Sequence, residues 1–308
     1  MAEMRFDDRV AVITGGGRGL GRAYAELLAA KGAKVAVNDP GGSMKGDAIV
    51  EDPAAEVVAA IKAAGGEAIA NYDSVATPEG GKAIIQSALD AWGRIDILIH
   101  NAGNVRYGSL KELSYEDFEA VLDVHLRGAF HVVRPAFPIM CEAGYGRVVL
   151  TSSIGGLYGN KRVTNYGVAK AGLLGLSNVV ALEGEEEGVK CNVIVPSAVT
   201  RMAEGIDTSQ YPPLGPELVA PMVGWLAHED CTVNGEFLVA IGGRMARAYI
   251  AESQGVYQPS WTIDEVAGRV EEIRDITDPW VLPVVPDAHK DHIVRSFGMT
   301  QVSEGAKA

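Results

Sequence analysis

Cysteine is scarce in this chain of 308 residues, which contains only Cys141, Cys191 and Cys231. Their number is odd, and their spacing is not that of metal ligands, so the sequence predicts no metal site. We interpret the three side chains as buried, reduced thiols of a protein from a cytosolic type of compartment.

Long apolar runs are also missing. No segment reaches the roughly 18 apolar residues of a membrane span, and the first eight residues contain no apolar core of a signal peptide. The last four residues, Gly305-Ala306-Lys307-Ala308, are not a peroxisomal address. We therefore expect no membrane attachment, and a bacterial cytoplasm rather than a eukaryotic peroxisome.

Positive charge is in deficit, with 27 Lys and Arg residues against 40 Asp and Glu residues and a net charge of −13. Such a balance disfavours nucleic acids and anionic membrane surfaces as partners. Hydrophobic residues make up 47% of the chain, which is enough for one large α/β core. Composition thus favours a soluble enzyme.

Short apolar segments alternate with segments of helical pattern along most of the chain. Strands are predicted near 9–14, 34–38, 67–71, 95–99, 146–151, 190–195 and 236–241, and helices near 19–31, 53–64, 79–92, 115–142, 164–187 and 216–228. This alternation predicts an α/β fold with a doubly wound, parallel, seven-stranded sheet of Rossmann type. We expect residues 1–243 to form one domain with the cofactor and catalytic sites. Residues 244–308 are predicted to be an extension that packs on this domain or on a neighbouring subunit.

A glycine-rich turn follows the first predicted strand. Its spacing is Thr14-Gly15-x-x-x-Gly19-x-Gly21, and it lacks the G-x-G-x-x-G fingerprint. Residues without side chains nevertheless let the backbone approach a pyrophosphate, which then rests on the N-terminus of the next helix. For the glycines alone, a plain turn is an equally good explanation.

Asp39 ends the second predicted strand, twenty residues after Gly19. A carboxylate at that place can accept hydrogen bonds from the ribose 2′-OH and repels a 2′-phosphate, which favours NAD over NADP. Arg18 points weakly the other way, because a basic residue in the turn could pair with a phosphate. We give Asp39 more weight because it should lie directly at the ribose.

Tyr166 and Lys170 are one helical turn apart, and Ser153 precedes the tyrosine by thirteen residues. A phenol is a poor base near neutral pH because its pKa is roughly 10. A cation one turn away is expected to stabilise the phenolate and lower that pKa, while a serine hydroxyl can hold a substrate oxygen. A Tyr-x-x-x-Lys pair also occurs by chance on many helices, so this hypothesis depends on the accompanying motifs.

Over roughly residues 7–243 the chain resembles the short-chain dehydrogenase/reductase family. The shared motifs are, in order, the glycine turn, Asn101-Ala102-Gly103, Ser153, Tyr166 and Lys170. The chain further resembles the (3R)-hydroxyacyl-CoA dehydrogenase branch of that family, which belongs to multifunctional enzymes. The segments that carry this narrower resemblance are 38–42, 71–75, 124–128, 151–153, 158–160, 172–176 and Arg201-Met202.

The resemblance implies a role for individual residues. The catalytic residues implied are Ser153, Tyr166, Lys170 and His125. Cofactor contacts are implied for Gly15, Arg18, Gly19, Leu20, Gly21, Asp39, Asp73, Ser74, Val75, Asn101, Ala102, Gly103, Tyr166, Lys170, Pro196 and Val199, with Gly103 leaving room for the cofactor. Substrate contacts are implied for Ser153, Tyr158, Asn160 and Met202, and no metal is expected.

Two histidines stand where the family usually has asparagine. At position 125 the family residue holds a water that feeds protons to the lysine. The His125 ring could hold the same water, or a backbone carbonyl could be the active contact and the ring structural. His100 we interpret as a strand-end histidine whose hydrogen bonds are satisfied.

These residues predict an NAD-dependent dehydrogenase. Ser153 would orient the substrate oxygen, and Tyr166 would take the hydroxyl proton as hydride passes to NAD. The resemblance implies a hydrophobic secondary alcohol, either a (3R)-hydroxyacyl-CoA thioester or a 17β-hydroxysteroid, and we expect a homodimer or homotetramer. One alternative is an NAD(P)H-dependent 3-ketoacyl (acyl-carrier-protein) reductase, which Asp39 disfavours. Another is a non-catalytic nucleotide-binding sensor or scaffold, which the intact catalytic residues disfavour.

Overall fold

The computed structural model describes residues 3–41, 52–198 and 213–305, with side chains up to residue 299. The chain divides into two compact units, one up to Arg247 and one from Ala248 onward. In the described parts of the chain no helix is both long enough and apolar enough to cross a membrane.

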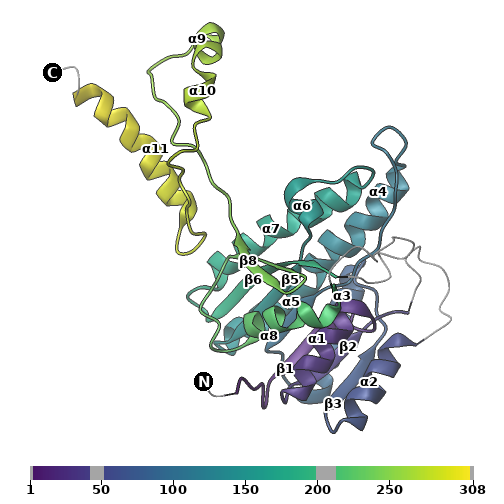
Figure 1. Cartoon of the computed structure of the whole chain (residues 1–308). Coiled ribbons are helices and arrows are strands. Elements are labelled where there is room, and N and C mark those ends of the chain that lie inside the picture. Colours follow the sequence, from purple (N-terminus) through teal and green to yellow (C-terminus); the bar gives the residue numbers. More distant parts are fainter. Residues whose placement is uncertain (1–2, 42–51, 199–212, 306–308) are drawn as a thin grey trace. The chain divides into compact units, whose positions relative to one another are not determined.

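The first unit is built on one sheet with the strand order β3-β2-β1-β4-β5-β6-β7-β8 (Figure 1). Its strands are β1 (Val10–Thr14), β2 (Lys34–Asn38), β3 (Glu67–Asn71), β4 (Ile97–His100), β5 (Gly146–Thr151), β6 (Val189–Ser197), β7 (Phe237–Ile241) and β8 (Arg244–Ala248). Each neighbouring pair from β3 to β7 is parallel. The predicted doubly wound parallel sheet is therefore confirmed.

An eighth strand was not predicted. Gly242 and Gly243 both have positive φ, 53° and 82°, as a two-residue hairpin turn requires, so β8 runs back beside β7. The strand has the sequence Arg-Met-Ala-Arg-Ala and contains no buried residue. It lacks the apolar run by which the other strands were recognised.

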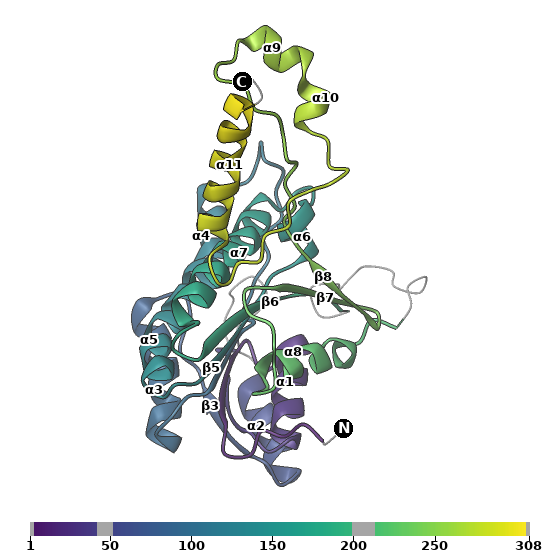
Figure 2. The ribbon, with the colours of Figure 1, turned by 90° about the vertical axis from the view of Figure 1, so that its left-hand side faces the viewer.

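Helices cover both faces of the sheet (Figure 2). On one face α1 (Gly19–Ala30), α2 (Pro53–Ala63) and α8 (Ala220–Ala227) pack together, preceded by the 3₁₀ turn η3 (Pro216–Leu218). On the other lie α3 (Pro78–Trp92), α4 (Tyr115–Leu122), α5 (Gly128–Glu142) and α7 (Thr164–Gly184), and α6 (Ile154–Tyr158) packs on α7. Every residue of β1 and β4 is consequently buried, as expected for strands covered on both sides.

The helix predicted over 115–142 is interrupted at its centre. Asp123–Arg127 form a π-helical turn, η1, between α4 and α5, and His125 is the buried residue of that turn. A π-turn inserts an extra residue into the helix and often marks a functional position. Here it lies beside the catalytic residues predicted from the sequence.

The second unit is small and contains α9 (Ile263–Gly268), α10 (Val270–Ile273) and α11 (Ala288–Gly305). A capping box starts α9, because the Thr262 hydroxyl and the Glu265 carboxylate satisfy each other's backbone N–H groups. Glu252 and Trp280 exchange two backbone hydrogen bonds of 3.0 and 2.8 Å. None of the described side chains of this unit is buried.

Candidate active site

The predicted site residues gather at the carboxyl edge of the sheet, where the parallel strands end. They follow β1, β2, β4 and β5, and are joined there by the π-turn η1 and the first turns of α7. Ligands of open α/β sheets bind at this edge. The topology therefore brings together motifs that are more than 150 residues apart in the sequence.

The glycine turn packs too tightly for side chains. Gly15 has a φ of +62°, and a Cβ there would lie 2.8 Å from the Cα of Ala102. At Gly21 a Cβ would lie 2.1 Å from the carbonyl oxygen of Gly15, and that oxygen accepts a hydrogen bond from Asn101 Nδ2 at 3.1 Å. No side-chain hydrogen bond caps the start of α1. A bare backbone turn leading into a helix start without a side-chain cap fits a pyrophosphate.

Asp39 lies against this turn. Its Oδ2 accepts a hydrogen bond from the Gly17 N–H at 3.1 Å, and its Oδ1 accepts one from Gly41 at 2.9 Å. A Cβ on Gly17 would come within 2.8 Å of the same carboxylate. Each carboxylate oxygen can accept a further bond, so the Asp39 side chain is both oriented and able to bind a ribose hydroxyl.

Two side-chain amides and one aspartate hold the ends of β2 and β3 together. The Asn38 amide donates to Asn71 Oδ1 at 2.7 Å and to the Asp73 carbonyl at 2.9 Å. Asn71 in turn donates to Asp73 Oδ2 at 2.8 Å. Asp73 is exposed, as is Ser74, whereas Val75 is buried. Sequence reasoning assigned no role to Asn38 or Asn71, which fix the loop that presents Asp73.

Ser153, Tyr166 and Lys170 come together as the spacing predicted. Ser153 caps α6 by accepting a hydrogen bond from the Gly155 N–H at 3.1 Å, and its hydroxyl lies near enough to Tyr166 to lower the pKa of the phenol. The Lys170 ammonium lies 5.6 Å from the centre of the Tyr166 ring and donates to the carbonyl of Thr151. Lys170 is 3% exposed.

Burial governs the charges of these groups. It lowers the pKa of Lys170 to about 7, since an ammonium is costly to bury. Burial also raises the pKa of Tyr166, and the hydrogen bond with Ser153 opposes this rise only in part. The expectation that Lys170 brings the tyrosine pKa below its usual value is therefore wrong for the protein alone.

His125 is completely buried and meets Tyr166 edge to face, with ring centroids 5.3 Å apart. Its Nε2 faces both the N–H and the carbonyl of Asn104, at 3.1 and 2.8 Å. Its Nδ1 has no hydrogen-bond partner among the described residues. Burial and the nearby Lys170 hold the pKa of His125 well below its usual value, so the ring is neutral.

Gly103 makes room for His125, and its role beside the cofactor stays a prediction. A Cβ on Gly103 would lie 2.5 Å from Cε1 of the imidazole. Only the tertiary structure could reveal this, because 22 positions separate the two residues in the sequence. The expectation for His100 is confirmed: its Nδ1 is 3.0 Å from the Thr14 hydroxyl and its Nε2 is 3.1 Å from the His125 carbonyl.

Asn165 was missed by sequence reasoning. It is fully buried, and its amide donates to the carbonyls of Arg106 and Asp117 at 3.2 and 3.0 Å. Its Oδ1 accepts from the N–H of Tyr166 at 2.8 Å. Asn165 thus ties the start of α7 to the loop after β4, although nothing in its sequence context distinguishes it from a surface asparagine.

The remaining predicted contacts lie around this centre. Arg18 and Leu20 flank the start of α1, and Pro196 lies near the end of β6, opposite Ala240. Tyr158, 80% exposed, and Asn160, also exposed, follow the capping serine through α6. Val199 and Met202, together with Arg201, lie outside the described residues. In the described part of the chain no group of three or more His, Cys, Asp or Glu side chains could hold a metal.

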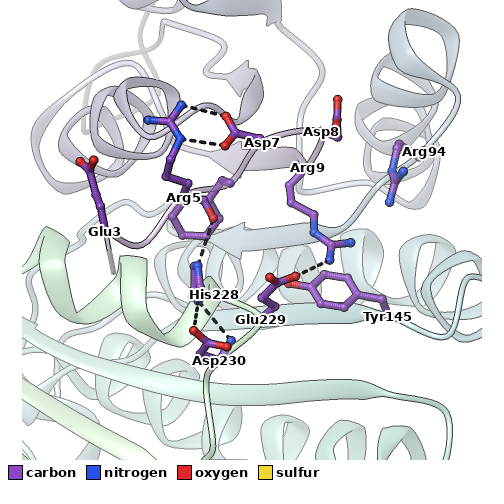
Figure 3. A pocket seen from close by; sticks show the side chains of 11 residues that line it. Glu3, Arg5, Asp7, Asp8, Arg9, Arg94, Tyr145, His228, Glu229 and Asp230 are labelled. Carbon is purple, nitrogen blue, oxygen red and sulfur yellow. Dashed lines mark hydrogen bonds and ion pairs between the residues drawn. The ribbon is translucent and has the colours of Figure 1, made fainter. Parts of the chain in front are cut away.

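The opposite, amino edge of the sheet contains a cavity of about 440 Å³ (Figure 3). Arg9 donates to Asp96 at 3.2 Å and to Glu229 at 2.8 Å, and its guanidinium lies 3.8 Å from the centre of the Tyr145 ring. His228 is hydrogen-bonded through Nε2 to the carbonyl of Arg5 at 3.0 Å. We call this region the amino-edge cluster.

Known proteins match most of the chain. The family model for short chain dehydrogenases matches residues 9–210. Peroxisomal multifunctional enzyme type 2 from Drosophila melanogaster is 45% identical over 276 residues, which are 89% of this chain and 45% of that protein. A short-chain type dehydrogenase/reductase from Mycobacterium tuberculosis is 45% identical over 276 residues, 88% of this chain and 95% of the relative.

The solved structure of the full-length Drosophila multifunctional enzyme superposes with a TM-score of 0.80 at 37% identity, covering 98% of this chain and 51% of that one. The chain thus spans about half the length of the multifunctional enzymes it matches. The resemblance inferred from the motifs is confirmed by these similarities.

Proposed function

The chain belongs to the short-chain dehydrogenase/reductase family, whose members are oxidoreductases acting on CH–OH groups, and on that premise we propose that it is an NAD-dependent dehydrogenase of a hydrophobic secondary alcohol. The substrate is a (3R)-hydroxyacyl-CoA thioester or a 17β-hydroxysteroid. The observation that carries the proposal is the placement of the Lys170 ammonium, which is buried and lies 5.6 Å from the centre of the Tyr166 ring, beside Ser153. That arrangement can hold an alcohol oxygen and remove its proton.

NAD as the cofactor is supported by the glycine turn and by Asp39. The backbone of Gly15 to Gly21 would hold the pyrophosphate, and the oriented Asp39 carboxylate would bind the ribose and repel the 2′-phosphate of NADP. When bound, NAD accepts a hydride from the carbon that carries the alcohol. The loop at Asp73 and the strand end at Asn101 complete the surface that would hold the adenosine.

The proton is handled by the chain's own residues. Ser153 lies beside Tyr166 and would receive the substrate oxygen on the same side. Tyr166 would take the hydroxyl proton, once a second positive charge at the site offsets the effect of burial on the pKa of the phenol. Lys170, whose pKa is about 7, exchanges protons readily near neutral pH. The partnerless Nδ1 of His125 favours the ring as the water-holding group.

A hydrophobic substrate is supported by the loops around Ser153. The loop after β4 and the loop after α6 are joined by a backbone bridge between Gly108 and Val163. Tyr107 and Leu110 in the loop after β4, and Tyr158 at the end of α6, are each at least 65% exposed. Apolar and aromatic side chains at a site opening suit an acyl chain or a sterol. Met202, proposed as a further contact, lies outside the described residues.

A kinetic screen tests the proposal. Medium-chain (3R)- and (3S)-hydroxyacyl-CoA thioesters, 17β-hydroxysteroids and small polyols are compared with NAD and with NADP. We expect turnover of a (3R)-hydroxyacyl-CoA or a steroid with NAD. Preference for a polyol or for the (3S) isomer contradicts the substrate assignment but leaves the dehydrogenase. NAD binding without turnover of any alcohol supports the sensor alternative.

The proposal also includes a cytoplasmic homodimer or homotetramer. The mycobacterial relative, which this chain covers almost completely, supports a bacterial type of enzyme without a peroxisome. Sedimentation of the purified protein and fractionation of the source cells test these two points. A monomer, or enrichment in an organelle, contradicts the corresponding point.

A further inference from the structure

His100 stands at the end of β4 with both ring nitrogens engaged. Its side chain is 1% exposed. Nδ1 faces the Thr14 hydroxyl at 3.0 Å, and Nε2 faces the main-chain carbonyl of His125 at 3.1 Å. One buried imidazole thus connects the end of β1 with the π-turn η1, although these elements are more than 100 residues apart.

The partners determine which nitrogen carries the proton. A carbonyl oxygen can only accept, so Nε2 must donate to His125 and Nδ1 must be the acceptor. The Thr14 hydroxyl then donates to Nδ1. Its oxygen remains free to accept from the N–H groups of Asn101 and Ala102, at 3.1 and 3.2 Å. Every donor in this set has an acceptor when His100 is neutral.

Burial and the charge of Lys170 support the neutral form, because both lower the pKa of His100, to about 3. A second proton on Nδ1 would leave the Thr14 hydroxyl without an acceptor. The network is therefore consistent in only one protonation state and one tautomer.

The two sides of His100 lead to different parts of the site. On one side Thr14 precedes the glycine turn, and Asn101 holds the Gly15 carbonyl at 3.1 Å. On the other side the His125 carbonyl belongs to the residue whose ring lies edge to face against Tyr166 at 5.3 Å. No hydrogen bond or ring contact joins His100 directly to Tyr166 in the described part of the chain.

We propose that His100 is a positioning residue that holds the cofactor turn and the catalytic helix segment in register, through Thr14 on one side and the His125 carbonyl on the other. The inference rests on the proposed dehydrogenase function, since it assigns His100 to that site. In this role Nε2 sets the position of residue 125, and thereby the packing of Tyr166. Nδ1 sets the Thr14 hydroxyl, and thereby the glycine turn.

Two substitutions separate the two connections. Asn places a polar atom where Nδ1 lies but is too short to reach the His125 carbonyl, whereas Gln places an N–H donor where Nε2 lies but offers nothing at Nδ1. His100→Asn should lower kcat by about 10-fold to 10²-fold, because small misplacements of a catalytic group are costly. Its KM for NAD should stay near the wild-type value.

His100→Gln should show the reverse pattern. Its kcat should remain within about 3-fold of wild type, while the loss of one hydrogen bond to Thr14 raises KM for NAD by about 3-fold to 10-fold. The proposal would be overturned if both variants lost kcat and NAD affinity equally. It would also be overturned if the Gln variant lost kcat while the Asn variant kept the wild-type kcat. A residue that merely fills volume predicts equal losses.

His228 provides the matched control. It is 5% exposed, and in the amino-edge cluster its ring nitrogens contact the Arg5 carbonyl and both the N–H and the carboxylate of Asp230. His228→Asn and His228→Gln should lower Tm without separating kcat from KM. If the His228 variants also showed a loss of kcat with Asn and a raised KM for NAD with Gln, the effect would belong to any buried histidine. That result would overturn the assignment to His100.

A measurement on the protein without substrate keeps the inference separate from the proposed function. The ¹⁵N chemical shifts of His100 at pH 7 should report the tautomer with a proton on Nε2. A proton on Nδ1 overturns the inference even if the enzyme is active. If the expected tautomer is found but no alcohol is turned over, only the proposed function is contradicted. The NAD dissociation constants of the Gln and Asn variants then show which of the two connections affects cofactor binding.

Discussion

The two edges of the sheet differ in whether a buried charged side chain has an oppositely charged partner. At the amino edge Asp96 is 1% exposed and accepts hydrogen bonds from Arg9, from Arg94 and from the Val10 N–H. At the carboxyl edge Lys170 is 3% exposed, and no carboxylate of the described residues forms an ion pair with it. One edge neutralises its buried charge, and the other keeps it unpaired.

Arg147 extends the contrast. It is buried at the amino edge and donates to the carbonyls of Gly146, Gly188, His228 and Glu229 at 2.8 to 3.2 Å. Its guanidinium is therefore held by main-chain dipoles. Lys170, by contrast, has a pKa of about 7.

The difference teaches how to separate structure from function in this fold. A buried charge with several oriented partners contributes to stability, and removing one partner is costly. A buried charge without an opposite charge lowers stability, and is retained where chemistry needs a shifted pKa. Activity should therefore depend on the carboxyl edge, and stability on the amino edge.

The largest effect is expected at Tyr166. Tyr166→Phe should lower kcat by about 10²-fold to 10⁴-fold, because the general base is removed. The dissociation constant of NAD should hardly change, since the hydroxyl is not needed for the glycine turn. Steady-state kinetics and a fluorescence titration with NAD measure the two quantities. Near-normal turnover by this variant would remove the proposed mechanism.

Asp96→Ala should produce the largest loss of stability. Two arginines and a backbone N–H lose their shared acceptor, and breaking such a buried set costs about 3–5 kcal/mol. The midpoint of urea unfolding measures this, while kcat per folded molecule should be unchanged.

Glu229→Gln is the matched control for Asp96. Its carboxylate pairs with the same Arg9 but its side chain is 59% exposed, so the expected loss is below about 1 kcal/mol. Equal losses at Asp96 and Glu229, or a fall in kcat in either variant, would erase the distinction between the two edges.

Asp39→Ala should change the cofactor preference by about 10-fold, through weaker NAD binding and less repulsion of NADP. The ratio of kcat/KM for the two cofactors measures it. The exposed Asp90 on α3, which bonds only Gln86, is the control, and its alanine variant should keep the wild-type ratio. A wild type that already prefers NADP shows the assignment to be wrong, and Arg18 then becomes the residue to test.

Stability is also expected to depend on pH. The pKa of His100 is lowered to about 3 in the folded protein, against about 6.5 in an unfolded chain. The unfolded state therefore binds the proton first, and stability is lost as the pH falls from 6.5 towards 3. His125 acts in the same direction. Urea unfolding between pH 7 and 4 should show a shallower decline in His100→Gln, and an unchanged slope would contradict the depressed pKa.

Lys170 adds a dependence on the alkaline side. Its pKa is about 7 in the folded protein and about 10.4 in an unfolded chain. Between these values the unfolded state holds the extra proton, so stability rises with pH.

Local patterns were sufficient for the main elements. The strand before the glycine turn, for example, has five apolar or small residues in a row, and β1 is buried throughout. The spacing of Tyr166 and Lys170 places them one helical turn apart on any helix. By contrast, β8 contains two arginines among five residues and no apolar run, so its pairing depends on the Gly242–Gly243 turn.

The sequence by itself determined the alternation of strands and helices, the glycine turn, and the Ser153, Tyr166 and Lys170 set, because each depends on residues that are close in the chain or on a regular period. Only the tertiary structure decided that Gly103 makes room for His125, that His100 binds the His125 carbonyl, and that burial raises the pKa of Tyr166. Those features depend on the distance between side chains from different elements and on how much water reaches them. Neither quantity is encoded in local spacing.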